Sequence, residues 1–374
     1  MSNFERLIPQ HIRNMSRYVP GKSVKQAERE SGVTSIKLAS NENPFGPSPL
    51  AVEAIQRAAA EVNWYPEPDS PELRRILAEK HGVTPGHVMV TAGTSSFLHI
   101  VGRTLLGPGL HAITSELSFI SYPIVCQAAG ATLVKVPMRD YGYNLDGIVK
   151  AINQDTRVIL FANPNNPTGS FVDVEAVDRF IERVPPHVLV VLDEAYADFA
   201  EAFAAERGVE YSHGLRYIKE GRNVVVMRTF SKAQGLAGLR LGYGLAHPDL
   251  VNYLSRVKVV FSVSSISDAA GVAAVRDTEH MQKTIRNNME GATYLTESLS
   301  AMGLRVLPTW ANFVYVEVDE DASELSKRLL AEGIIIRPLG GWGAKTAIRV
   351  TIGKPEENEA FVAAMKKVVG AAVR

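Results

Sequence analysis

The sequence has little that would tie it to an oxidising compartment or a membrane. Cys126 is the only cysteine among 374 residues, which excludes an intramolecular disulfide, fits a reducing compartment and predicts a small core residue. The segment Met1 to Tyr18 carries charges among its apolar residues and has no secretory pattern. No later apolar run approaches the ~18 residues that a membrane helix needs. We therefore expect a cytoplasmic protein.

The chain also lacks an excess of charge of either sign. Lys+Arg 40 balance Asp+Glu 40, so the formal net charge is +0 and the sequence pI is ≈ 7.1. We expect no overall attraction to nucleic acid or to an anionic membrane. The nine histidines show no His-Glu-x-x-His spacing, and no Gly-x-Gly-x-x-Gly joins an early strand to a helix. The sequence therefore predicts no metal site and disfavours a dinucleotide-binding oxidoreductase, and the expected partner is a small molecule.

Apolar runs typical of strands alternate with helical patterns along the first two-thirds of the chain. Continuous Val/Ile/Leu runs joined by helices predict a mostly parallel sheet that is buried on both faces. Ser70 before Pro71 predicts the N-cap of a further helix. The strands are expected at 87–90, 112–115, 132–137, 158–161, 188–192 and 223–228, and the helices between them at 95–106, 121–129, 145–152 and 174–183.

The pattern changes after about residue 260, where long helical stretches are followed by a few strands. A chain of this length can form about two domains. We expect an α/β protein with residues 1–40 as an N-terminal arm and part of the small domain. Residues 41–260 would form a large ligand-binding domain, and residues 261–374 a small α+β domain.

An acid and a lysine stand where a cofactor would need them. Asp193 follows the apolar strand 188–192, so its carboxylate is expected at the carboxyl edge of the sheet, where open α/β folds bind ligands. Lys232 ends the run Arg228-Thr229-Phe230-Ser231-Lys232, and Arg240 follows in a glycine-spaced stretch. A lone strand-end Asp more often caps a turn. Together, however, these residues offer a Schiff-base amine, a phosphate partner and a pyridinium partner, which a pyridoxal phosphate enzyme requires.

Two loops add to this constellation. Asn163 to Gly169 follows the strand 158–161, and its two prolines restrict the backbone so that an asparagine amide can point into a cleft. Thr91 to Ser96 opens a helix, where free N–H groups suit a phosphate, although plain N-capping explains it equally well. Arg240 lies between two leucines and is expected to be buried and to need an anion.

In this order and spacing, the motifs resemble the fold-type I pyridoxal phosphate aminotransferases. Within them, further segments resemble the histidinol-phosphate aminotransferases, and the similarity runs from about residue 35 to the C-terminus. The resemblance implies transfer of an amino group from histidinol phosphate to 2-oxoglutarate, giving imidazole acetol phosphate and glutamate. The segments that carry it are Asn163 to Gly169, Asp193 to Tyr196, Ser231-Lys232, Gly238 to Gly242, Leu38 to Ser48, Tyr65-Pro66, Ile336 to Pro338 and Ile348 to Gly353.

The resemblance also implies a role for individual residues. Lys232 would hold pyridoxal 5'-phosphate as a Schiff base, and Asp193 would pair with its ring nitrogen. Asn166 and Tyr196 would bind its phenolic oxygen, and Phe119 would stack on its ring. Its phosphate would be held by Gly93, Thr94, Ser95, Ser231 and Arg240.

The remaining implied roles concern the substrates and a second subunit. Arg349 would bind an α-carboxylate, Arg337 the distal anion of histidinol phosphate or glutamate, and Asn43 the substrate. Tyr65 would reach the cofactor phosphate of a neighbouring subunit, which implies a homodimer with shared active sites.

Departures from the family pattern keep other functions open. Phe119 stands where the family commonly has a tyrosine, and Thr94-Ser95-Ser96 lacks the acid often found there. Trp310 and Trp342 add aromatic surface on the expected substrate side. These features leave room for an aromatic amino acid aminotransferase or a related decarboxylase of a phosphorylated amino acid. From another class, a non-catalytic pyridoxal-phosphate-binding regulator is possible, but no DNA-binding module accompanies it.

Overall fold

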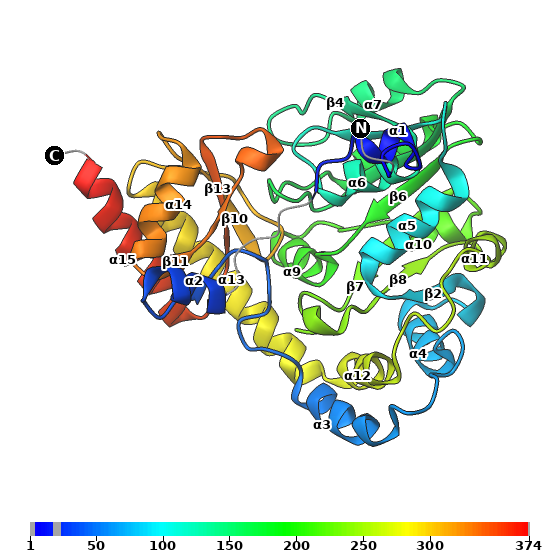
Figure 1. Ribbon diagram of the computed structural model, residues 1–374, viewed down its shortest axis with the longest axis horizontal. Coiled ribbons are helices and arrows are strands. Elements are labelled where there is room, and N and C mark those ends of the chain that lie inside the picture. The colour runs from blue at the N-terminus through cyan, green and yellow to red at the C-terminus, as the bar shows by residue number, and fades with distance from the viewer. Residues whose placement is uncertain (1–3, 18–23, 373–374) are drawn as a thin grey trace.

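The computed structural model describes residues 4–17 and 24–372 and contains two units, each built on a β-sheet (Figure 1). The larger unit holds a seven-stranded sheet with the order β2-β8-β7-β6-β5-β3-β4. Its strands are β2 (Val88–Thr91), β3 (His111–Ser115), β4 (Thr132–Val136), β5 (Thr156–Ala162), β6 (Leu189–Asp193), β7 (Val224–Thr229) and β8 (Gly242–Leu245).

Most neighbours in this sheet are parallel, which confirms the predicted sheet type. The pairs β4·β3, β3·β5, β5·β6 and β6·β7 are parallel, whereas β8 is antiparallel to both β7 and β2. The sequence did not predict β8, because Gly242 and Gly244 dilute its apolar pattern. The sheet packs closely on the helix behind it here, since a Cβ on Gly244 would lie 2.1 Å from the Phe97 ring.

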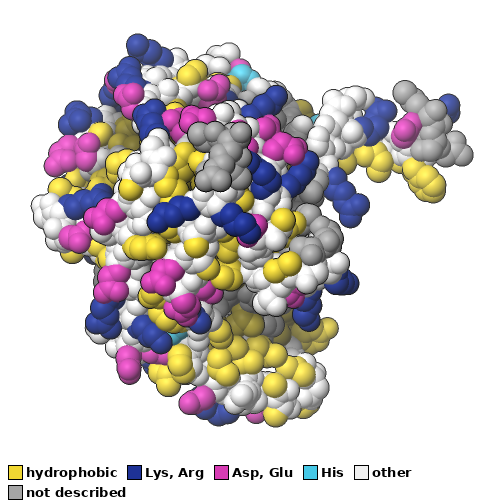
Figure 2. All heavy atoms as spheres, turned by 90° about the vertical axis from the view of Figure 1, so that its left-hand side faces the viewer, with side chains coloured by type: hydrophobic (Ala, Val, Ile, Leu, Met, Phe, Trp, Pro, Cys, Tyr) yellow, Lys and Arg dark blue, Asp and Glu magenta, His cyan; other side chains and the backbone are white. Residues whose placement is uncertain are grey.

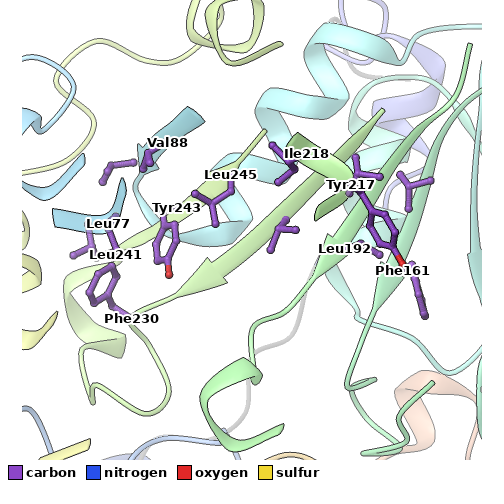
Figure 3. Packing of buried hydrophobic residues seen from close by; sticks show 14 of the residues in the cluster. Leu77, Val88, Phe161, Leu192, Tyr217, Ile218, Phe230, Leu241, Tyr243 and Leu245 are labelled. Carbon is purple, nitrogen blue, oxygen red and sulfur yellow. The ribbon is translucent and has the colours of Figure 1, made fainter. Parts of the chain in front are cut away.

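Helices cover both faces of the large sheet, which explains its continuous apolar strands. One core contains Phe161, Leu192 and Tyr243 beneath the helices of its face (Figure 3). The other core contains Met227 and fully buried Cys126, whose pKa burial raises to about 12. The helices are α3 (Pro49–Ala58), α4 (Pro71–His81), α7 (Leu145–Ala151), α8 (Val174–Arg183), α10 (Gly214–Lys219) and α12 (Ser265–Arg276) for the first core, and α5 (Gly93–Leu105), α6 (Ser121–Ala128) and α11 (Pro248–Ser255) for the second.

The smaller unit joins the end of the chain to a segment near its start. A four-stranded sheet has the order β12-β13-β10-β9, and β1 pairs in parallel with β11. Its strands are β1 (Ile36–Lys37), β9 (Arg305–Val306), β10 (Phe313–Glu317), β11 (Ile334–Ile335), β12 (Arg337–Pro338) and β13 (Ala347–Thr351). Its helices are α2 (Val24–Ser31), α14 (Ala322–Ala331) and α15 (Pro355–Ala372). The long helix α13 (Thr278–Ser300) runs from beside α12 to this unit (Figure 1).

Three details differ from or refine the expectations. Ser70 has φ 52 and makes no side-chain cap hydrogen bond, although the helix does begin at Pro71. The predicted division at residue 261 stays a prediction, and the packing of α12 into the core of the large sheet favours a boundary after that helix. Residues 1–3 and 18–23 of the expected arm lie outside the described residues. No helix among those described is long and apolar enough to cross a membrane.

Candidate active site

A cavity of about 220 Å³ lies at the carboxyl ends of the parallel strands, where the two units meet. Asp193 is the last residue of β6, and the segments after β5 and β7 contribute further side chains. The start of α5 and the strands β12 and β13 complete the wall. The predicted residues that line it are Thr94, Ser95, Phe119, Asn166, Asp193, Tyr196, Ser231, Lys232, Arg240, Arg337 and Arg349.

Asp193 is a buried carboxylate with neutral partners. It is 4% exposed, its Oδ2 accepts a 3.0 Å hydrogen bond from Tyr122 Oη, and its Oδ1 accepts a 3.3 Å bond from the N–H of Ala195. Burial raises the pKa of this carboxyl to about 6, and the two hydrogen bonds oppose the rise. Within the described part of the chain it has no ion-pair partner. Because a buried charge needs a partner, the site suits a ligand with a cationic nitrogen.

The surroundings of Lys232 favour the neutral, nucleophilic form of its amine. Its Nζ donates a 3.2 Å hydrogen bond to the carbonyl of Ser40 and lies 5.7 Å from the centroid of the Tyr196 ring. Burial lowers the pKa of Lys232 to about 7, and the nearby charge of Arg349 lowers it further. A large share of the amine is therefore neutral near pH 7, and neutral amines are nucleophiles and bases.

Tyr196 is held by two amides. Its hydroxyl oxygen accepts hydrogen bonds from Asn41 Nδ2 at 2.8 Å and from Asn166 Nδ2 at 3.0 Å. The hydroxyl proton therefore remains available for a ligand oxygen. Asn166 in turn accepts a 2.6 Å bond from Arg349 Nη1, while Arg349 Nη2 donates to the carbonyl of Ala39 at 2.8 Å. These contacts fix Tyr196, Asn166 and Arg349 as one network.

The start of α5 and Arg240 form a pocket for an anion. Gly93 has φ +80, which favours glycine, and a Cβ there would stand 2.9 Å from Arg240 Nη2, so the backbone at the start of α5 lies close to this guanidinium. The first N–H groups of α5 and the hydroxyl of Ser231 also face this end of the cavity. The expected burial of Arg240 is wrong. The residue has φ 51 and is exposed, because its side chain lines the open cavity, and its Nη1 donates to the carbonyl of Ala237 at 2.9 Å.

Two further arginines lie side by side on neighbouring strands of the cavity wall. Arg337 on β12 is the direct cross-strand partner of Arg349 on β13. Like charges in such a pair repel each other, and Arg337 Nε is buried with no hydrogen-bond partner among the described residues. Both side chains line the cavity, so an anion between them would relieve the repulsion. The cavity therefore offers one place for an anion at the start of α5 and a second beside Arg337.

Comparison with known proteins identifies the family. The model of "Aminotransferase class I and II" matches residues 33–365. The chain belongs to this family. It is 43% identical over 372 residues to "Histidinol-phosphate aminotransferase 2" of Pseudomonas aeruginosa, with 99% of each chain covered. It is 41% identical to "Histidinol-phosphate aminotransferase" of Moorella thermoacetica, with 96% of this chain and 92% of that protein covered.

A solved structure confirms the predicted fold. The histidinol-phosphate aminotransferase of Sinorhizobium meliloti, in complex with pyridoxal-5'-phosphate, superposes with a TM-score of 0.88 and 29% identity and covers 98% of both chains. The predicted membership in the fold-type I aminotransferases is therefore confirmed. The cavity fits the same cofactor, since Asp193 suits a protonated ring nitrogen, Lys232 a carbonyl carbon and the start of α5 a phosphate.

Three predicted site residues, Gly93, Tyr65 and Asn43, do not line the cavity of this aminotransferase, although Gly93 lies against Arg240, which does. Tyr65 is 82% exposed, and its ring stacks on Phe261 with centroids 4.8 Å apart. Asn43 has both amide atoms engaged, because Nδ2 donates to the carbonyl of Ala233 at 2.8 Å and Oδ1 accepts from the N–H of Phe45 at 2.9 Å. Asn43 therefore braces the chain next to Lys232, and the geometry gives no support to its predicted substrate contact.

Sequence reasoning missed several residues at the site. Asn41 and Tyr122 bond directly to Tyr196 and Asp193, and Ser40 accepts the bond from Lys232. Asn41 has φ 57, and its place in Ser40-Asn41-Glu42-Asn43 was the one available signal. The two tryptophans separate: Trp342 lines the cavity, whereas Trp310 stacks on Phe171 with centroids 4.1 Å apart, outside the lining.

Proposed function

We propose that this aminotransferase uses histidinol phosphate as amino donor and 2-oxoglutarate as acceptor, giving imidazole acetol phosphate and glutamate in histidine biosynthesis. The observation that carries the proposal is the arginine pair Arg337 and Arg349, which lines the cavity and suits a donor with an anion far from its amine. The names of the relatives from Pseudomonas aeruginosa and Moorella thermoacetica support the same substrate.

The enzyme depends on pyridoxal 5'-phosphate, which supplies an electrophilic carbon and an electron-withdrawing ring when it is bound. Lys232 Nζ would take the proton from Cα of the donor and return it two atoms away, to the cofactor carbon that is bonded to the amino nitrogen. Asp193 would keep a proton on the ring nitrogen, because its buried carboxylate has no ion-pair partner among the described residues. Tyr196 and Asn166 orient the ring oxygen, and Arg240 with the start of α5 holds the phosphate.

The two arginines divide the recognition of the substrates. Histidinol phosphate carries a phosphate and no carboxylate, whereas glutamate carries an α-carboxylate and a distal carboxylate. Arg349 binds the α-carboxylate with its planar guanidinium. Arg337, whose Nε still lacks a hydrogen-bond acceptor within the described structure, binds the distal phosphate or carboxylate.

An aromatic amino acid is the second candidate donor, because Phe119 and Trp342 both line the cavity. The deciding experiment measures kcat/KM for histidinol phosphate and for phenylalanine with 2-oxoglutarate as acceptor. A clear preference for histidinol phosphate supports the proposal. A preference for phenylalanine would overturn it in favour of an aromatic amino acid aminotransferase.

The functional unit of the proposal is a homodimer. Exposed apolar side chains form a patch, the Trp64 patch, that a second copy of the chain would cover. Tyr65 and Phe261 of this patch stack on each other, and hydrophobic atoms also gather elsewhere, in the lower part of the face shown in Figure 2. The Trp64 patch consists of Val62, Trp64, Tyr65, Val259, Val260 and Phe261. Within the dimer, Tyr65 would reach the phosphate of the partner's cofactor.

A cytoplasmic location remains a prediction from the sequence.

A further inference from the structure

A glycine-rich turn carries Trp342 to the wall of the cavity. Trp342 ends the short helix η4 (Gly340–Trp342), and Gly343 follows with φ +94. The carbonyl of Leu339 accepts hydrogen bonds from the N–H of Trp342 at 2.9 Å and from that of Ala344 at 3.2 Å. The turn is thus closed on itself, and the half-buried indole packs beside Leu339. The position of Trp342 is therefore defined by its own backbone.

The indole is also fixed from the other unit. Trp342 Nε1 donates a 3.0 Å hydrogen bond to the carbonyl of Ser118, the residue directly before Phe119. Trp342 belongs to the turn between β12 and β13, whereas Ser118 precedes α6 of the large unit. Two independent constraints hold the ring, so it presents a preorganised face instead of adapting to each ligand.

The neighbours of Trp342 define what could lie against it. Phe119, Ile120 and Trp342 form an apolar part of the lining, and Arg337 lies five residues before Trp342 in the same wall. An apolar, aromatic surface next to a cation suits a flat ring that is linked to an anion. Glutamate offers the anion without the ring. The cavity therefore has a contact that only one class of donor can use.

We propose that Trp342 is a specificity-determining residue that packs against the ring of a ring-bearing amino donor and contributes little to ring-free donors. This inference rests on the proposed function and deepens it. Paired aromatic rings attract each other beyond the area they bury. We expect the contact to change affinity about tenfold.

The competing explanation is that Trp342 only ties the two units together through its bond to Ser118. Two variants separate the explanations. Trp342→Phe keeps an aromatic face and removes the N–H donor, whereas Trp342→Leu removes both. If the aromatic ring of Trp342 matters, Trp342→Phe should bind a ring-bearing ligand with nearly the wild-type affinity, and Trp342→Leu should bind it more weakly. An equal loss of affinity in the two variants would mean that the hydrogen bond to Ser118 is what matters.

The test uses two unreactive probes on the enzyme loaded with pyridoxal phosphate. 3-(Imidazol-4-yl)propyl phosphate has the ring and the phosphate of histidinol phosphate but no amine, and propyl phosphate lacks the ring. Calorimetry should show that Trp342→Leu weakens the ring probe about tenfold and propyl phosphate less than twofold. Trp342→Phe should bind both probes within about threefold of the wild type. Equal losses for both probes, or no loss for either, would overturn the proposal.

Failure of this inference can be told from failure of the proposed function. If the wild type binds the ring probe no more tightly than propyl phosphate, the ring contributes nothing to binding and the inference about Trp342 is overturned. If the wild type binds the ring probe more tightly but does not turn over histidinol phosphate, the proposed function fails. In that case the binding ratios in the two variants still decide the role of Trp342.

Discussion

At the scale of single residues, the buried carboxylate of Asp193 suits a cofactor but lowers the stability of the cofactor-free protein. Its pKa of about 6 in the folded protein exceeds the ~3.9 of an unfolded aspartate. Between these values the native state binds more protons, so its stability falls as the pH rises through that window and stays lower above it. The buried carboxylate therefore destabilises the cofactor-free protein at neutral pH.

We expect Asp193→Asn to stabilise the cofactor-free protein above pH 6 by about 1–3 kcal/mol, because the buried charge at position 193 is then absent. The same change should slow each half-reaction by roughly a hundredfold or more, since the ring nitrogen loses its anionic partner. Urea unfolding at pH 4 and pH 7.5, together with single-turnover rates, measures both effects. Near wild-type half-reaction rates would exclude the role assigned to Asp193.

Lys232 should carry the cofactor, and its capture should depend on pH. The folded pKa of about 7 lies below the ordinary lysine value near 10.4, so the neutral amine becomes the major form as the pH rises through about 7. The rate at which the cofactor-free protein takes up pyridoxal phosphate should rise over this range and then level off. Borohydride reduction followed by peptide mapping should leave the label on Lys232. A label on another lysine would refute the assignment.

Deleting Arg337 or Arg349 should affect different donors. Arg337→Ala should lower kcat/KM roughly ten- to a hundredfold for histidinol phosphate and glutamate but little for phenylalanine, because charge-assisted contacts are strong. Arg349→Ala should harm glutamate and phenylalanine more than histidinol phosphate, which has no carboxylate. Some loss with every donor is expected from Arg349→Ala, since Arg349 also holds Asn166. Equal losses across the three donors in both variants would contradict this division.

The sequence could predict the residues that lie in compact motifs and not those that meet across the fold. Lys232, Asp193 and Asn166 follow strands, so their common edge of the sheet follows from the strand pattern. Tyr122 lies 71 positions from Asp193 and Asn41 lies 155 positions from Tyr196, so only tertiary packing shows these contacts.

At the scale of elements, an ion cluster with a buried carboxylate, Glu194, joins the ends of β6 and β7 next to Asp193. Arg228 donates to Glu194 Oε2 through Nε at 3.0 Å and Nη2 at 2.8 Å, and its Nη1 lies 2.9 Å from Glu201. Glu194 is adjacent to Asp193 and is itself buried. Arg228 therefore neutralises a charge that would otherwise raise the pKa of Asp193 further.

Removing Arg228 should leave the buried carboxylate of Glu194 without its ion-pair partner. We expect Arg228→Met to lower the free energy of unfolding by about 3–5 kcal/mol. The double variant Glu194→Gln/Arg228→Met should recover part of that loss, because both charges are then absent. Denaturant unfolding of the wild type, both single variants and the double variant gives the coupling energy. Strictly additive effects would show that the pair does not act as a unit.

Strand positions were predictable because the central strands are buried on both faces. Continuous Val/Ile/Leu runs placed β5, β6 and β7 within one or two residues of their observed ends. Signals that depend on tertiary context failed. The glycines of β8 mark close packing on α5 and not a loop, and the left-handed conformation of Ser70 removes the predicted capping bond.

At the scale of the whole molecule, the position of Tyr65 bears on the number of chains in the functional unit. Within one chain its ring lies on Phe261 in the Trp64 patch and not in the cavity. Large exposed apolar patches on a protein surface mark interaction sites. A symmetric dimer would place the same patch of both subunits at one interface.

Mixing two inactive variants tests whether sites are shared. In Tyr65→Ala the chain keeps its own Lys232 but cannot complete the partner's site, and in Lys232→Ala the reverse holds. Random pairing of equal amounts gives about half hybrid dimers, each with one intact site, so about a quarter of the wild-type activity should return after subunit exchange. The control mixes Tyr65→Ala with the double variant Tyr65→Ala/Lys232→Ala, in which Lys232 is present in one chain but no site can receive Tyr65. If native mass spectrometry confirms exchange and activity does not rise above this control, Tyr65 acts within its own chain or not at all.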